Sequence, residues 1–258
     1  MDKNKSPLRY PGGKTRAIKI LDKYIETYFK GRKRVLSPFF GGGSFEIHLQ
    51  GKGYEVLGND LFKPLYEFWS SAKTDSKKLA ETVKNMMPIT KEKFCSLRKE
   101  ENITAAAYYC INRCSFSGST FCGGYSAQAA VGRLNDLSLE TLKRVNLSKI
   151  AFSNKDCITF LKENVEDINT FIYADPPYYI ESYIYGKDGD LHQAFDHGAF
   201  ALYLKTRSDW ILSYNDCEYI RELYKDSRII KEAWSYGMNA SKKSSEIIIL
   251  PSLPLQPS

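Results

Sequence analysis

The sequence predicts an α/β fold with a mainly parallel sheet that is interrupted by a run of helices. Short apolar strands alternate with amphipathic helices near both ends of the chain, a pattern typical of parallel sheets. Residues 61–113 instead predict helix after helix, with no convincing strand between them. The chain has 258 residues, of which 43% are hydrophobic and 26% charged. This length and composition suit one large globular domain with an insert.

The elements before the insert follow from apolar spacing and from glycine. Helical spacing and short apolar runs predict a helix at 15–29, a strand at 34–36, a helix at 44–49 and a strand at 54–58. The turn Gly41-Gly42-Gly43 lies between the first strand and its helix, and the second strand ends at Asp60. Residues 34–60 therefore predict a unit of strand, glycine turn, helix and strand.

The insert and the return of the α/β pattern are predicted in the same way. Helices are expected at 61–72, 76–86, 91–99 and 103–113. Residues 114–132 are rich in serine, glycine and small residues, which predicts an exposed loop or hairpin rather than packed core. Later strands are expected at 146–152, 170–174, 210–214, 228–235 and 246–250, with helices at 157–163, 195–205 and 218–224. The α/β domain thus comprises 1–60 and 147–258, and the insert 61–146.

The charge of the chain is unevenly distributed. Residues 1–34 hold eleven Lys and Arg against three Asp and Glu, whereas the remainder hold 26 basic and 27 acidic residues. A basic stretch on a neutral body favours a polyanionic partner, although a solvated helix face explains it equally well. No apolar run approaches the roughly 20 residues of a membrane helix. The six cysteines contain no C-x-x-C pair, so we expect reduced thiols and no metal. The expected location is the cytoplasm or, for a viral protein, the interior of the host cell.

The glycine turn predicts a nucleoside-binding site. Glycines at a turn between strand and helix let a ligand approach the backbone closely, and a carboxylate at the next strand end, here Asp60, can accept both ribose hydroxyls. Glu46 occupies the place of the third glycine of a dinucleotide fingerprint, so S-adenosylmethionine suits the pattern better than NAD. Gly13-Lys14-Thr15 is similar to the end of a phosphate-binding loop. Leu8 replaces that loop's first glycine, which argues against an NTPase.

The segment Asp175-Pro176-Pro177-Tyr178 follows a predicted strand, where ligands bind in open α/β sheets. The amine of adenine is a poor nucleophile because its lone pair is delocalised into the ring. The Asp175 carboxylate and the Pro176 carbonyl can accept its two N–H bonds and localise that lone pair. Tyr178 can stack on an extruded base, an interaction worth about 1–3 kcal/mol. A strand-ending proline turn is the alternative interpretation.

These motifs together resemble the Dam-like, D12 class DNA adenine-N6 methyltransferases of the alpha group, over nearly the whole chain. The resemblance implies a Rossmann-like S-adenosyl-L-methionine-dependent methyltransferase sheet with a helical target-recognition insert. It implies that Asp175, Pro176, Pro177 and Tyr178 are catalytic. The cofactor-binding residues that it implies are Tyr10, Gly13, Lys14, Phe39, Gly41, Gly43, Asp60, Asp156 and Asp175. Ser37 stands where the family usually has an acidic residue. The cofactor contact affected by this difference is the one to the methionine amino group.

The resemblance also implies how DNA is read. A hairpin beginning near Asn112, within residues 112–133, would enter double-stranded DNA. The DNA-binding residues expected from it are Arg9, Asn112, Arg113, Phe116, Ser117 and Arg133. Members that read GATC carry an aliphatic residue and an arginine after the hairpin glycine, where this chain has Ser119-Thr120-Phe121. We therefore expect a short, palindromic, adenine-containing site, and the sequence does not specify GATC. Gln128 or Arg133 could supply a replacement reader, although a place in a solvated loop is the favoured role for either one singly.

The predicted activity is methyl transfer to a flipped-out adenine, yielding S-adenosyl-L-homocysteine without a metal. Two alternatives stay open on the sequence: an RNA or protein amide or amine methyltransferase, and a non-catalytic DNA-binding module. The oligomeric state and a cognate restriction endonuclease acting on the same site are also left open.

Overall fold

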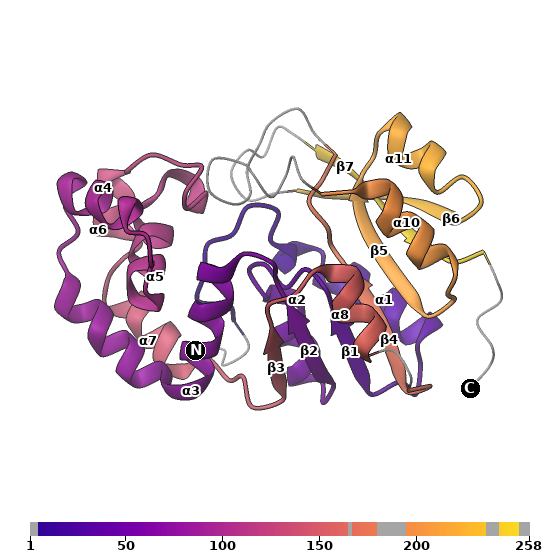
Figure 1. The fold of residues 1–258 in the computed structure, drawn as a ribbon, viewed down its shortest axis with the longest axis horizontal. Coiled ribbons are helices and arrows are strands. Elements are labelled where there is room, and N and C mark those ends of the chain that lie inside the picture. Colours follow the sequence, from indigo (N-terminus) through magenta and orange to yellow (C-terminus); the bar gives the residue numbers. More distant parts are fainter. Residues whose placement is uncertain (1–4, 165–166, 180–194, 236–242, 253–258) are drawn as a thin grey trace.

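The computed structural model describes residues 5–164, 167–179, 195–235 and 243–252. Its seven-stranded sheet has the order β3-β2-β1-β4-β5-β7-β6 (Figure 1). The strands are β1 Arg34–Ser37, β2 Glu55–Asn59, β3 Ile150–Ser153, β4 Thr170–Ala174, β5 Trp210–Asn215, β6 Arg228–Ser235 and β7 Lys243–Leu250. Strands β1 to β5 pair in parallel, and β7 runs antiparallel to both β5 and β6. The predicted α/β class and its Rossmann-like sheet are confirmed.

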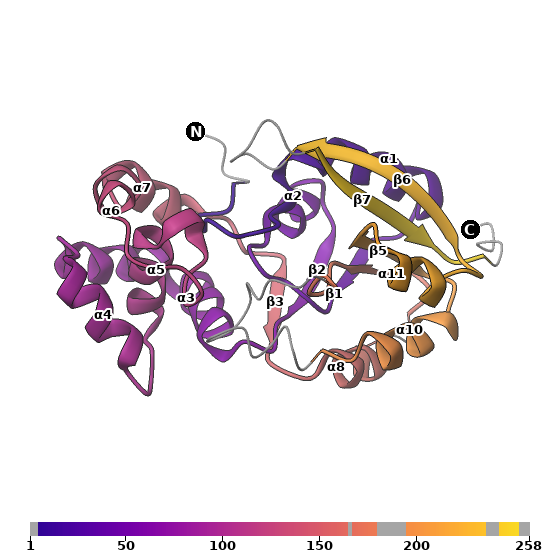
Figure 2. The same cartoon turned by 90° about the horizontal axis from the view of Figure 1, so that it is seen from above.

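Helices cover both faces of this sheet, which explains why the central strands are apolar throughout. Helices α1 (Ile18–Tyr28) and α2 (Ser44–Gly51) lie on one face, whereas α8 (Cys157–Asn164) and α10 (His197–Lys205) lie on the other (Figure 2). Helix α11 (Glu218–Leu223) packs on the same side as α8 and α10. All five residues of β4 are buried between the two layers.

The strand order reverses between β1 and β4, and this reversal places the candidate site. The chain passes from β1 to β2 on one side of the sheet and reaches β4 and β5 on the other. Ligands in open α/β sheets bind at such a switch point, beyond the carboxyl ends of the strands. The glycine turn after β1 and Asp175 after β4 therefore emerge at the same edge, because the two strands are parallel neighbours.

The helical segment stands beside the β3 edge of the sheet (Figure 1). Its helices are α3 Lys63–Met86, α4 Lys91–Lys99, α5 Ala105–Cys114, α6 Ala127–Gly132 and α7 Asp136–Arg144. The two helices predicted at 61–72 and 76–86 are one element, α3, with a kink at Asp75 (φ −157°, ψ 86°). Thr90 and Thr104 cap the N-termini of α4 and α5 with their side chains.

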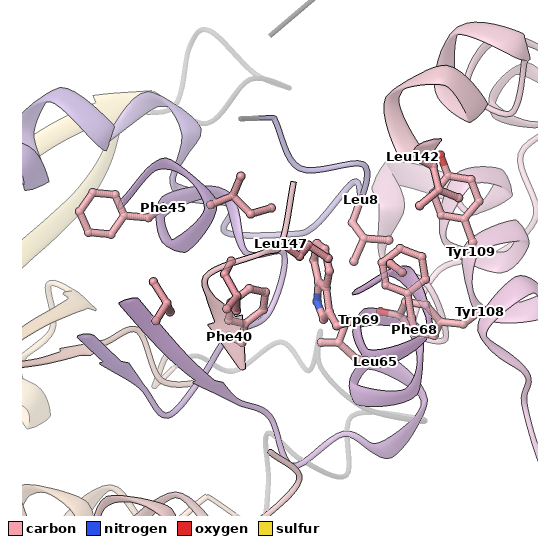
Figure 3. Close-up of a cluster of buried hydrophobic side chains, with 14 of the residues drawn as sticks. Leu8, Phe40, Phe45, Leu65, Phe68, Trp69, Tyr108, Tyr109, Leu142 and Leu147 are labelled. Carbon is pink, nitrogen blue, oxygen red and sulfur yellow. The ribbon is translucent and has the colours of Figure 1, made fainter. Parts of the chain in front are cut away.

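A continuous aromatic core joins the helical segment to the sheet (Figure 3). Phe40, beside the glycine turn, contacts Trp69 of α3 with ring centroids 5.2 Å apart. Trp69 contacts Phe68 at 5.0 Å, and Phe68 stacks on Tyr109 of α5 at 5.7 Å. The position of the helical segment is therefore coupled to the turn that borders the candidate site.

The prediction of an exposed loop at 114–132 is wrong in part. Phe121 is buried, with its ring against Phe62 and Tyr108, and residues 127–132 form helix α6, capped by Ser126. Composition alone favours a loop here, but apolar packing against α3 and α5 orders the segment. The strand predicted from residue 146 begins only at Ile150.

Candidate active site

A pocket lies at the carboxyl edge of the sheet, bordered by the segments that follow β1, β2 and β4 and by the N-terminal segment. The structure brings together there all nine predicted cofactor-binding residues, namely Tyr10, Gly13, Lys14, Phe39, Gly41, Gly43, Asp60, Asp156 and Asp175. Three further residues border the pocket and were not predicted as site residues: Glu46 of α2, and Phe195 and Asp196 before α10.

The glycine turn is shaped by contacts that exclude larger residues. Gly41 and Gly43 have positive φ of 49° and 63°, a conformation that side chains rarely adopt. A Cβ added to Gly42 would lie 2.5 Å from the Cβ of Tyr10, so the N-terminal segment packs directly on the turn. Trp69 donates a 2.9 Å hydrogen bond from Nε1 to the carbonyl of Gly41. The turn is thus held open toward the pocket by residues from two distant segments.

Asp60 is bound to the same turn. Its Oδ2 accepts from the Gly41 N–H at 2.9 Å, and its Oδ1 accepts from the Phe62 N–H at 3.0 Å. Burial raises the pKa of Asp60 to about 6, and the two backbone bonds only partly oppose this rise. Asp156 differs, because it is exposed and its Oδ1 accepts from the N–H groups of Ile158 and Thr159 at the start of α8.

The Asp175 carboxylate is held from both sides. Its Oδ2 forms an ion pair with the buried ammonium of Lys14 at 2.7 Å, and its Oδ1 accepts from Ser213 Oγ at 2.9 Å. Ser213 lies in the neighbouring strand β5. Both contacts come from segments far away in the sequence, so the orientation of Asp175 depends on the assembled sheet.

Tyr178 belongs to the same network. Its hydroxyl accepts from Lys14 Nζ at 2.8 Å and donates to Glu246 Oε2 at 2.8 Å. Glu246 of β7 is a buried carboxylate at the head of an apolar run, a pattern that could have marked it in the sequence. Of the two prolines, Pro177 lines the pocket and Pro176 is buried.

The prediction that Asn112 contacts DNA directly is not supported, because its side chain is fully buried. Its Oδ1 accepts from the Arg9 N–H at 3.0 Å, and its Nδ2 donates to the carbonyl of Arg9 at 2.6 Å. Nδ2 also bonds to the Gly118 carbonyl and Thr120 Oγ1. The amide therefore clamps the N-terminal segment to the loop after α5, and its correct description is a residue that holds Arg9.

Three arginines gather beside this clamp. Burial lowers the pKa of Arg9, and the charges of Arg113 and Arg133 lower it further. Arg113 donates to the carbonyls of Arg133 and Pro7, and Arg9 donates to the carbonyl of Ser115. Within the described part of the chain, none of the three forms an ion pair with a carboxylate. A cluster of like charges without acidic partners favours an anionic ligand.

The loop that carries this cluster also presents an aromatic side chain. Phe116 is 69% exposed, whereas many of the aromatic rings in the described residues are buried. Ser117, which follows it, has φ of 57°, and Gly118 has φ of 74°. A Cβ on Gly118 would lie 2.6 Å from the Cβ of Arg9. The tight turn therefore projects Phe116 outward while its base packs on the N-terminal segment.

The described residues contain neither a candidate metal site nor a candidate membrane span. They contain no group of three or more His, Cys, Asp or Glu that could hold a metal ion. Over the same ranges, every helix is too short or too polar to cross a membrane.

Comparison with known proteins gives one match. The model of the family described as D12 class N6 adenine-specific DNA methyltransferase matches residues 10–238, most of the chain. Comparison with curated proteins found no match.

Proposed function

The chain belongs to the D12 class N6 adenine-specific DNA methyltransferase family, and from this premise we propose which of its residues bind the cofactor, the adenine and the DNA. Members of this family use S-adenosyl-L-methionine and methylate the N6 amine of adenine in DNA, and base flipping is one of their general features. We also propose that the activity is site-specific, with residues 61–146 as the target-recognition domain.

The pocket fits this cofactor chemically. Gly41 and Gly42 leave the turn without side chains, and Asp60 presents a carboxylate beside the turn, where ribose hydroxyls could donate to it. Phe39 and Asp156 line the same pocket and would border the adenine ring. When bound, the cofactor supplies an activated methyl group on a sulfonium. The protein's part is to hold the nucleoside and direct the acceptor amine toward that group.

Asp175 and Pro176 are proposed to act on the adenine amine. Adenine in a duplex must leave the stack, because its amine is engaged in pairing. The Asp175 carboxylate accepts one N–H of the amine, and the Pro176 carbonyl accepts the other. Lys14 and Ser213 keep the carboxylate in one orientation, as their 2.7 Å and 2.9 Å contacts support. The acceptor is therefore positioned before the base arrives, and charge that develops on the amine meets an oriented anion.

Tyr178 is proposed to stack on the extruded base. Its hydroxyl is bound on one side by Lys14 and on the other by Glu246, which restricts rotation of the side chain. A fixed ring loses little conformational freedom when a base stacks on it.

The arginine cluster and Phe116 are proposed to bind DNA. Arg9, Arg113 and Arg133 would neutralise phosphates or meet guanine edges. The exposed ring of Phe116 would insert where the adenine has left the stack. Because Asn112 ties Arg9 to this loop, the reader and the inserted ring would move as one unit.

The observation that carries the proposal is the convergence of the glycine turn, Asp60 and the Asp175 segment on one pocket. The test is methylation of plasmid DNA by the purified protein with labelled cofactor, scored for N6-methyladenine and mapped by sequencing. We expect labelled N6-methyladenine in one short sequence context, and none with Asp175→Ala. Methylation of RNA or protein but not DNA would contradict the proposal.

A further inference from the structure

Glu46 is a buried carboxylate that borders the cofactor pocket and has no part in the chemistry above. It lies in the first turn of α2, directly after the glycine turn, and is 3% exposed. Its Oε1 accepts a 2.9 Å hydrogen bond from Ser37 Oγ, at the end of β1. Within the described ranges, Ser37 is the one side chain seen to donate to it. The backbone N–H of Glu46 also stabilises its carboxylate. Buried charges are normally paired with an opposite charge, and both of these donors are neutral, so among the described residues Glu46 lacks a cationic partner of its own.

None of the described groups that interact with Glu46 is a cation paired with Glu46 alone. Besides Ser37, it interacts electrostatically with Lys14 of the N-terminal segment and with Asp175 and Tyr173 of the β4 segment. Lys14 is the one cation among them, and its ammonium is bound to Asp175 at 2.7 Å. Burial raises the pKa of Glu46 to about 8, with the nearby Asp175 charge adding to the rise. This raised pKa favours the protonated form of Glu46 until a further cation lies beside it.

The position of Glu46 indicates which part of the cofactor it faces. Its coupling to Lys14 and Asp175 places it near the methyl-transfer end of the pocket. Asp60 instead lies beside the glycine turn and Phe62, at the side proposed for the ribose. The methionine part of the cofactor is attached at the sulfur and bears an α-ammonium group, the kind of ligand that a buried carboxylate beside a hydroxyl can bind.

We propose that Glu46, oriented by Ser37, binds the α-ammonium group of the cofactor's methionine moiety. This inference rests on the proposed function of the pocket as the cofactor site. It explains how the chain tolerates Ser37 where the family usually has an acidic residue: the carboxylate is supplied from α2 and reaches the position beside β1. Binding then replaces the proton on Glu46 with the ligand's ammonium.

The test is calorimetry with S-adenosyl-L-homocysteine, whose one cation is the α-ammonium, and with an analogue that has a hydroxyl in place of that amine. Loss of a hydrogen bond to a charged group weakens binding by roughly ten- to a hundredfold. We expect the wild-type protein to prefer the amine by about this factor and Glu46→Gln to show little preference. 5′-Methylthioadenosine, which lacks the methionine tail, should bind both proteins alike and so shows that Glu46→Gln folds.

Proton release gives a second readout. A carboxyl with a pKa of about 8 is largely protonated at pH 7, so amine binding to the wild-type protein should release close to one proton. Titrations in buffers of different ionisation enthalpy measure this number, which should fall to near zero in Glu46→Gln. Ser37→Asp combined with Glu46→Gln returns the carboxylate to β1 and should restore the preference for the amine.

An unchanged preference and unchanged proton release in Glu46→Gln would overturn the inference. Failure of the wild-type protein to bind S-adenosyl-L-homocysteine at all would instead refute the proposed cofactor site, so the two failures are distinguishable.

Discussion

Replacing Asp175 by asparagine separates its catalytic role from its structural one. The variant keeps the shape of the side chain and an oxygen that can accept from Ser213, but it removes the charge paired with Lys14. The distance from Lys14 Nζ to Asp175 Oδ2 is 2.7 Å, and the two side chains are 4% and 20% exposed. At an effective dielectric constant of about 20, the Coulomb attraction between them is roughly 6 kcal/mol before desolvation is counted.

The expected loss of stability is smaller than this gross attraction. Removing one partner of a buried ion pair costs about 3–5 kcal/mol. Asp175 is partly exposed, and Lys14 still donates to Gly12 and Tyr178. We therefore expect Asp175→Asn to lower the free energy of unfolding by about 3 kcal/mol, the lower end of that range. Urea denaturation would measure this change.

Activity should fall for a different reason, namely loss of the anionic acceptor for the adenine amine. Single-turnover methyl transfer should drop by at least about 100-fold, the lower range for a positioned proton acceptor, while affinity for S-adenosyl-L-homocysteine stays nearly unchanged. The control is Lys14→Met combined with Asp175→Asn. This pair of changes also removes the buried ammonium of Lys14, so stability should recover while turnover does not. Near wild-type turnover in Asp175→Asn would refute the catalytic assignment, and failure of the control to regain stability would refute the ion-pair reasoning.

Three further predictions concern ribose binding, DNA binding and the clamp. Asp60→Ala should weaken S-adenosyl-L-homocysteine binding at least about tenfold. Because the ionised carboxylate accepts from the ribose, the affinity of the wild-type protein should rise as pH increases through about 6. A titration with no such rise would contradict this assignment. Arg133→Ala should lower the slope of DNA affinity against salt concentration by the contribution of about one phosphate contact. It should also make methylation less selective for its sequence. Plasmid modification confined to GATC in both proteins would show that Arg133 does not read the site. Asn112→Ala removes the acceptor of the Arg9 N–H, so it should destabilise the protein by about 1–3 kcal/mol. It should also broaden the sequence preference of methylation. An unchanged unfolding curve would refute the role of Asn112 as a clamp.

Features that depend on local chemistry could be predicted from the order of the residues. Apolar periodicity and turn residues predicted the α/β order and the helical interruption, and the elements at 91–99 and 170–174 match helix α4 and strand β4 residue for residue. Glycine at a turn and proline after a strand constrain the backbone wherever they occur, so Gly41 and Asp175 could be identified as candidates without coordinates.

Which side chains contact one another depends on the assembled fold. The order of the strands places Ser213 beside Asp175 and Glu246 beside Tyr178, across sequence separations that no local pattern encodes. Packing turned Asn112 from a predicted DNA contact into a buried clamp, because the loop after α5 folds back onto Arg9. Side-chain burial and charge pairing depend on the assembled neighbours, and for that reason the environment of a carboxylate such as Glu46 became visible only in the folded protein.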